Sequence, residues 1–135
     1  MKIVIAGAGE VGLHLSKMLS YESHDITLID NNEVNLKDGE NYLDIKVVNG
    51  DSSSPSTLDK ANVSNADLVI GVTASESINF FTCILSKKLG AEVGASIDLT
   101  GSKELGGDLD LEFKTGTIET KTIDLNPAFV DAETV

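Results

Sequence analysis

The chain of 135 residues contains no arginine and no tryptophan, and it has a single cysteine. Without arginine, it has no guanidinium group that could hold a phosphate through two parallel hydrogen bonds. Any phosphate site must therefore use backbone N–H groups, hydroxyls, lysine or a metal. The single cysteine, Cys83, excludes an intramolecular disulfide and is typical of a protein from a reducing cytoplasm. We expect its thiol to be packed in the core rather than reactive.

Long apolar runs are also missing. The longest span a handful of residues, whereas a membrane helix needs roughly 20, so we predict no direct insertion into a membrane. The beginning of the sequence, MKIVIAGAGEVG, lacks the long apolar stretch and cleavage site of a secretory signal. An apolar content of 41% is ordinary for a folded protein.

Positive charge is scarce. The 22 acidic residues face ten lysines, and the formal net charge is −12. Such a surface repels phosphate backbones and anionic lipids, so we expect no nucleic-acid partner.

The first 91 residues alternate between short β-branched runs and segments with helical spacing. Near-continuous apolar runs are typical of parallel strands that are buried on both faces. In the first helix Val11, Leu15, Met18 and Leu19 share a face. The last helix begins at Ser75 and ends near Gly90, and its shared face is formed by Ile78, Phe81, Leu85 and Leu89. We predict an α/β fold, a Rossmann-like doubly wound parallel sheet, with strands over residues 2–6, 26–30, 45–48 and 68–72.

The segment from residue 92 onward has a different pattern. It carries ten acidic residues and three lysines, so it contributes −7 of the net charge. Residues 94–99 read as a fifth strand. Residues 109–114 and 117–125 alternate apolar and polar side chains, which is typical of a β-hairpin with one wet face. We therefore divide the chain into a nucleotide-binding domain, 1–99, and an atypical acidic tail, 100–135.

A glycine-rich loop directly follows the first predicted strand and opens the first helix. It has the spacing G-x-G-x-x-G, in which Gly7 permits a tight turn, Gly9 lets the backbone approach a pyrophosphate and Gly12 lets the helix lie close to the sheet. The N-terminus of the helix then offers N–H groups and a positive dipole end to phosphates. The alternative is that the glycines serve only the turn.

Asp30 ends the second predicted strand, where an acidic residue can bind ribose hydroxyls and would repel a 2′-phosphate. Asn31 follows it, at a position where an NADP-binding site would have arginine. The alternative role for Asp30 is a solvated helix cap. The ribose contact leaves NAD(H) and an adenine nucleotide both open, while the missing arginines and Glu10 favour a dinucleotide pyrophosphate over a triphosphate.

Hydroxyl, amide and carboxylate side chains follow the third and fourth strands, at residues 50–53 and 73–79. In open α/β sheets the carboxyl ends of the strands bind ligands, so both groups are candidates for the same crevice. The alternative is simple helix capping, for which Ser, Thr, Asp and Asn are preferred.

The sequence offers no obvious catalytic group. His14 lies inside the first helix and His24 precedes the second strand, so neither is expected at the crevice. There are no paired metal ligands and no Walker lysine. These absences favour a nucleotide sensor without chemistry of its own.

The motifs GAGEVG, ITLID, VVNGDSS and ADLVIGVTASESIN together resemble the amino-terminal domain of Trk-type potassium-uptake regulators, over residues 1–91. This resemblance implies a cytoplasmic, Rossmann-like RCK domain that binds NAD(H) or adenine nucleotides. It also implies a homodimer or higher homo-oligomer beneath a potassium channel or transporter subunit in the membrane. The predicted cofactor-binding residues are Gly7, Ala8, Gly9, Glu10, Val11, Gly12, Asp30, Asn31, Asp51, Ser52, Thr73, Ala74 and Glu76.

The sequence thus predicts a non-catalytic, nucleotide-sensing regulatory domain of a potassium-uptake system. The main alternative is an NAD-dependent oxidoreductase module whose substrate residues lie on another chain. A third hypothesis is a folded scaffold whose tail has lost its partner surface.

Overall fold

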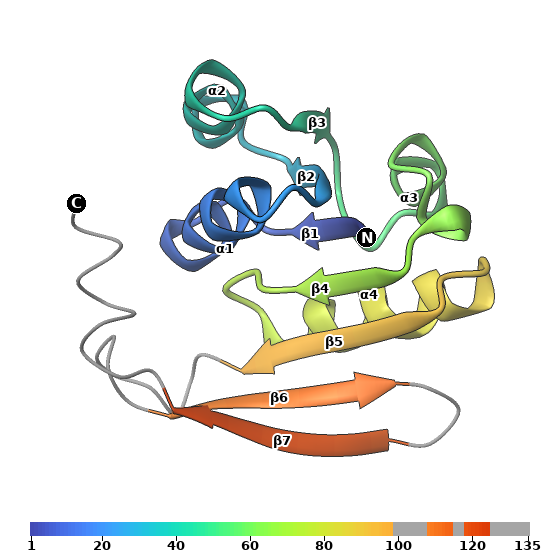
Figure 1. Cartoon of the computed structure of the whole chain (residues 1–135). Coiled ribbons are helices and arrows are strands. Elements are labelled where there is room, and N and C mark those ends of the chain that lie inside the picture. Colours follow the sequence, from blue (N-terminus) through green and yellow to red (C-terminus); the bar gives the residue numbers. More distant parts are fainter. Residues whose placement is uncertain (99–107, 115–117, 125–135) are drawn as a thin grey trace.

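The computed structural model describes residues 1–98, 108–114 and 118–124 (Figure 1). Strands and helices alternate along the chain, as the sequence predicts. They are β1 (Lys2–Ala6), α1 (Glu10–Tyr21), β2 (Asp25–Asp30), α2 (Glu33–Tyr42), β3 (Lys46–Asn49), α3 (Pro55–Lys60), the 3₁₀ helix η1 (Val63–Asn65), β4 (Leu68–Gly71), α4 (Glu76–Lys88), β5 (Val93–Asp98), β6 (Asp108–Lys114) and β7 (Ile118–Asp124).

The strands form one sheet in the order β3-β2-β1-β4-β5-β6-β7. The first five are parallel, which confirms the predicted fold class, and β5 adds to β4 as expected. β6 and β7 extend the same sheet as antiparallel strands. The chain runs outward from β1 to β3 and then crosses to β4 on the other side of β1. In open α/β sheets this reversal point opens a crevice at the carboxyl ends of the strands.

Helices cover both faces of the parallel strands, and each face has its own core. On one face, Val11 of α1 and Leu36 of α2 pack on Ile5 and Leu28. On the other face, Leu58 of α3 lies in a cluster with Val4 and Ile29. Figure 1 shows α4 behind β4 and β5. Side chains from the two sides of each strand are therefore buried, which explains the near-continuous apolar runs.

The buried face of α4 is polar, and here the helical pattern was misleading. An amphipathic helix would be expected to bury its apolar face. Instead Phe81 is 50% exposed and Leu89 is 38% exposed. The residues that α4 buries are small or polar, and they are Asn79, Thr82, Cys83 and Ser86.

Close contact between α4 and the sheet explains this inversion. A Cβ atom added at Gly71 would lie 2.8–2.9 Å from backbone atoms of Asn79, and one at Gly94 would lie 3.0 Å from the Cβ of Cys83. The helix lies so near to β4 and β5 that only compact side chains fit between them. Cys83 is fully buried, so the prediction of a packed thiol is confirmed.

The described helices were compared with what a membrane-spanning helix needs. Within the described part of the chain, none of the helices combines the length and the apolar character that a bilayer crossing requires.

Candidate functional site

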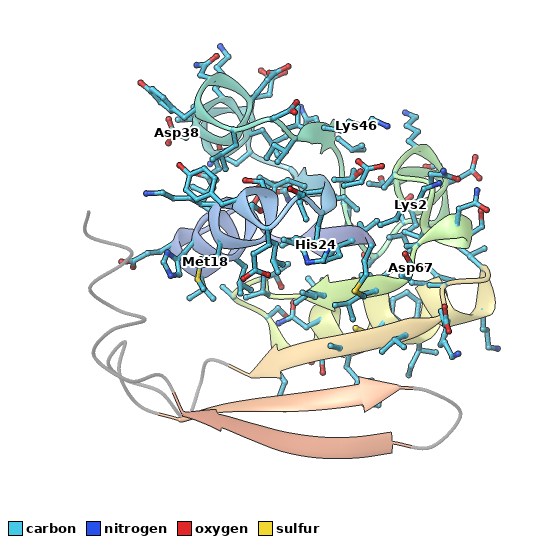
Figure 2. All side chains as sticks on the ribbon, viewed as in Figure 1. Lys2, Met18, His24, Asp38, Lys46 and Asp67 are labelled. Atoms are coloured by element: carbon cyan, nitrogen blue, oxygen red, sulfur yellow. The ribbon has the colours of Figure 1, made fainter. Side chains whose placement is uncertain are left out.

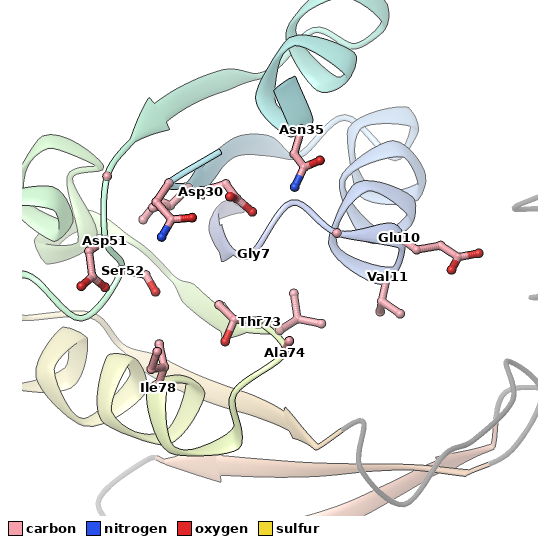
Figure 3. A pocket seen from close by; sticks show the side chains of 15 residues that line it. Gly7, Glu10, Val11, Asp30, Asn35, Asp51, Ser52, Thr73, Ala74 and Ile78 are labelled. Atoms are coloured by element: carbon pink, nitrogen blue, oxygen red, sulfur yellow. The ribbon is translucent and has the colours of Figure 1, made fainter. Parts of the chain in front are cut away.

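A cavity of about 470 Å³ opens at the carboxyl ends of β1 to β4, at the point where the strand order reverses (Figure 3). Its volume lies in the range of small-molecule sites, about 300–1,000 Å³. The structure brings ten of the predicted residues to its wall, namely Gly7, Gly9, Glu10, Val11, Asp30, Asn31, Asp51, Ser52, Thr73 and Ala74.

Three predicted residues do not line the cavity: Ala8, Gly12 and Glu76. Ala8, within the loop, is fully buried. Glu76 is exposed in the first turn of α4, where a carboxylate favours the helix dipole. Five lining residues are not among the predicted cofactor-binding residues, and they are Ile29, Asn35, Gly50, Val72 and Ile78. Gly50 and Ile78 lie in the segments 50–53 and 73–79 that were candidates for the crevice, whereas nothing in the local sequence marks Asn35 of α2.

Two of the loop glycines are required by the fold. Gly7 has a φ of +121°, and a Cβ there would lie 2.8 Å from the backbone of Val72 and Thr73. A Cβ at Gly12 would lie 1.7 Å from the carbonyl oxygen of Gly7. These contacts bring the loop against β4 and bring α1 against the loop.

Gly9 is different, because a Cβ at this position would meet no atom of the described residues within 4 Å. Its φ of −74° is accessible to any residue. The fold therefore gives no reason for glycine at this position, although the residue lines the cavity. A missing side chain leaves room for a ligand to reach the backbone.

Gly9 is also the N-cap of α1, and it makes no side-chain hydrogen bond to the helix. The first N–H groups of a helix have no partner within the helix. In α1 these groups face the cavity beside Gly9, Glu10 and Val11. They supply hydrogen-bond donors and a positive dipole end, which suits a phosphate group. The Glu10 side chain points away from Asp30 and Asp51 (Figure 3).

Asp30 joins the glycine loop to β2. Its Oδ2 accepts a hydrogen bond from the Ala8 N–H at 2.7 Å, and its Oδ1 accepts one from the Asn32 N–H at 2.7 Å. The cap of α2 is Asn32, whose side chain accepts a hydrogen bond from the Val34 N–H at 2.9 Å. A carboxylate has about four acceptor positions, so Asp30 retains capacity for a hydroxyl of a ligand.

Asp51 is a further carboxylate on the wall. Its Oδ1 accepts hydrogen bonds from the hydroxyl of Ser53 at 2.7 Å and from the Ser53 N–H at 2.8 Å. These two hydrogen bonds lower the pKa of Asp51 below its ordinary value of 3.8. The side chain is therefore ionised at neutral pH. Among the described residues no lysine lines the cavity, so the donors that can meet a phosphate there are backbone N–H groups, hydroxyls and the side-chain amides of Asn31 and Asn35.

The polar face of α4 holds the two loops on the far side of the cavity. The Asn79 Oδ1 accepts hydrogen bonds from the N–H of Thr73 at 2.7 Å and its hydroxyl at 2.6 Å, and the Asn79 Nδ2 donates to the Thr73 carbonyl at 3.0 Å. The Thr82 hydroxyl donates to the Ser52 carbonyl oxygen at 3.1 Å. Asn79 was expected at the crevice itself, but it is buried behind Thr73.

The side chain of Ser75 accepts a hydrogen bond from the Ile78 N–H, so the capping role predicted as its alternative is present. Neither histidine lines the cavity. No group of three or more metal-binding side chains occurs among the residues described by the structure.

A model of the TrkA-N domain family matches residues 3–105 of the chain. The chain belongs to this family. The match extends beyond residues 1–91, which carry the four sequence motifs, and it includes β5.

Several proteins that are similar to this TrkA-N chain carry potassium-uptake names. The chain is 46% identical over 83 residues to the Trk system potassium uptake protein TrkA of Haemophilus influenzae, covering 62% of this chain and 18% of that protein. It is 32% identical over 117 residues to a TrkA homolog of Pyrococcus horikoshii, covering 85% of this chain and 51% of that protein. The chain thus spans about half or less of the length of these relatives.

Solved structures with low sequence identity share the fold. The chain matches "Shewanella denitrificans Kef CTD in AMP bound form" with a TM-score of 0.54 and 21% identity, over 65% of this chain and 52% of the other. It matches "GsuK channel bound to NAD" with a TM-score of 0.56 and 16% identity, over 83% and 27% of the two chains. The reductase ChuY of Escherichia coli O157:H7 also matches, with a TM-score of 0.56 and 15% identity over 68% and 48%.

Proposed function

We propose that this TrkA-N domain binds NAD(H) in the crevice and serves as a non-catalytic regulatory domain of a potassium-uptake system. The observation that carries the nucleotide part is the open backbone at Gly9. It lies at the uncapped N-terminus of α1, in the same cavity as the carboxylate of Asp30. A dinucleotide has both groups that such a site suits, a pyrophosphate for the helix terminus and ribose hydroxyls for the carboxylate.

The roles of the individual residues follow from this arrangement. Gly9, Glu10 and Val11 present backbone N–H groups to the pyrophosphate. Asp30 accepts hydrogen bonds from the hydroxyls of the adenosine ribose. Asp51, Ser52 and Thr73 complete the opposite wall.

The electrostatics of the crevice support a dinucleotide over a triphosphate. Three acidic residues, Glu10, Asp30 and Asp51, line the cavity and no described lysine does, so each added phosphate charge is met only by uncharged N–H groups and hydroxyls. The GsuK channel bound to NAD and the Kef domain in its AMP-bound form share the fold. AMP has the same adenosine ribose, so adenine nucleotides remain the alternative ligand of the same site.

The regulatory part of the proposal draws on the names of the relatives. Trk potassium uptake proteins from bacteria and archaea match the chain over most of its TrkA-N domain. We therefore place the chain on the cytoplasmic side of a potassium transporter or channel subunit, as a homodimer or higher oligomer. The exposed side chains of Phe80 and Phe81 on α4, and of Leu89 at its C-cap, supply an apolar surface for contact between subunits.

Calorimetry with NAD, NADH, NADP, AMP and ATP tests the nucleotide part. We expect NAD or NADH to bind most tightly, and Gly9→Asp to abolish binding by filling the phosphate position with a negative side chain. Ser64→Asp is the matched control, because it adds the same charge at an exposed position away from the cavity. Preference for ATP or NADP, or equal binding by Gly9→Asp, would overturn the proposed ligand.

A further inference from the structure

A second cavity, of about 330 Å³, lies at the opposite end of the sheet, where the parallel strands begin. Its wall includes three lysines from three different elements: Lys2 of β1, Lys46 of β3 and Lys60 at the end of α3. Seven of the ten lysines have described side chains. Three of those seven therefore meet at one cavity of a protein whose net charge is −12.

The register of the sheet explains why two of these lysines converge. Lys2 pairs with Asp25 of β2, and Lys46 pairs with Thr27 of the same strand. Successive side chains of a strand alternate between faces. Lys2 therefore shares its face with Val4, and Lys46 shares its face with Val48, and both valines belong to the core on the α3 side. Figure 2 shows Lys46 pointing from β3 toward the side of α3.

The short length of α3 leaves this end of the sheet open. The helix has six residues, so it is about 9 Å long, and it ends at Lys60. Beyond it, Ala61 and Asn62 turn away toward η1 and form a wall of the cavity. The third lysine thus lines the cavity from the end of α3, whereas the other two belong to strands of the sheet.

None of the three ammonium groups forms an ion pair with a described carboxylate. Within the described residues, the pair closer than 4.0 Å joins His24 and Glu22. Asp25 is the acidic residue among the described residues of the wall. Just outside the wall, the carboxylate of Asp67 accepts a hydrogen bond from the Lys2 backbone N–H at 2.8 Å. Three lysines and these two carboxylates leave a local formal charge of +1. The Thr27 hydroxyl adds a polar group between Lys2 and Lys46.

We propose that this lysine-lined cavity is a binding site for a small multivalent oxyanion, such as a phosphate ester or a polycarboxylate. Each lysine supplies a point charge and up to three hydrogen-bond donors, and such groups bind phosphates and carboxylates without guanidinium geometry. The volume fits a small molecule. The site is separate from the nucleotide crevice, because the two lie at opposite ends of the strands and share no lining residue.

The test is a titration of the full chain with inorganic pyrophosphate and, in a separate arm, with citrate, at constant low ionic strength. Backbone amide NMR signals locate the bound anion. We expect saturable shifts at Thr27, Lys46 and Asn62. The two arms distinguish a phosphate site from a polycarboxylate site.

The double variant Lys46→Gln/Lys60→Gln should weaken binding about tenfold or more, because each removes a charge-assisted hydrogen bond. Lys37→Gln/Lys88→Gln is the matched control, since it removes the same charge from exposed positions on α2 and α4. We expect less than about a twofold change in this control. Equal weakening in both double variants would show a non-specific charge effect and overturn the site. Shifts confined to Gly9 and Thr73, or no saturation with either anion, would overturn it as well.

Discussion

The carboxylate of Asp30 holds the backbone of Ala8, with the Oδ2 of Asp30 accepting the Ala8 N–H at 2.7 Å. The acidic residue at the end of β2 therefore fixes the glycine loop that follows β1. The residue proposed to bind ribose also shapes the loop proposed to bind pyrophosphate. The two halves of the nucleotide site are thus coupled through one side chain.

Replacing Asp30 should weaken nucleotide binding, because it removes both the proposed ribose contact and the hydrogen bond that holds the glycine loop. We expect Asp30→Ala to cost about 1–3 kcal/mol of NAD binding free energy, since hydrogen bonds to a charged group have this order of strength. Calorimetry measures this loss, and the exposed Asp38→Ala of α2 is the control of equal charge. An unchanged NAD affinity in Asp30→Ala would place the ribose elsewhere.

Gly9 and Gly12 should respond differently to alanine. A Cβ at Gly12 collides with the carbonyl oxygen of Gly7, so we expect Gly12→Ala to reduce the free energy of unfolding by about 1–3 kcal/mol or more. Gly9→Ala has open space, so its unfolding free energy should fall by less than about 1 kcal/mol while its NAD affinity drops. Urea unfolding and calorimetry of both variants test this pair. The reverse pattern would contradict the assignment of fold and ligand roles.

Thr82 should control the loop that carries Asp51 and Ser52. Thr82→Val keeps the shape but removes the hydroxyl that donates to the buried Ser52 carbonyl, which should cost about 1–3 kcal/mol of stability. Amide exchange should accelerate at Ser52 and Ser53. Thr82→Ser keeps the hydroxyl and serves as the control. Equal amide exchange rates at Ser52 and Ser53 in Thr82→Val and Thr82→Ser would show that this hydrogen bond does not hold the loop.

The pKa of Asp51 should depend on its hydrogen bonds from Ser53. Because both hydrogen bonds stabilise the ionised form, the folded-state pKa lies below 3.8, and this carboxylate stabilises the fold above that value. The contribution is lost as the pH falls through the folded-state pKa. Side-chain carboxyl NMR should give a midpoint below 3.8, and Ser53→Ala should raise it. A midpoint that does not move in Ser53→Ala would contradict this cause.

The domain should carry out no redox chemistry by itself. In the described part of the chain neither a histidine nor a lysine lines the nucleotide cavity, so no such acid or base stands there beside a bound nicotinamide. NADH incubated with the chain and a panel of carbonyl acceptors should show no protein-dependent oxidation, measured by the loss of NADH absorbance. Saturable turnover that Gly9→Asp abolishes would instead favour an oxidoreductase module.

The sequence by itself determined the order of elements and the location of the crevice. Apolar runs and glycine spacing are local signals, and the carboxyl ends of parallel strands must meet at one edge of a sheet. For this reason, ten of the predicted binding residues line the same cavity. That they bind a nucleotide stays a prediction.

Only the tertiary structure decided what packs between the elements. Helical spacing favoured burial of Phe81 and Leu89, but the glycines of β4 and β5 bring α4 so close that Asn79 and Thr82 are buried instead. The bond from Asp30 to Ala8 spans 22 residues, and the lysine-lined cavity joins residues from β1, β3 and α3. Such contacts depend on register and on the distance between packed layers, and neither is encoded in a local pattern.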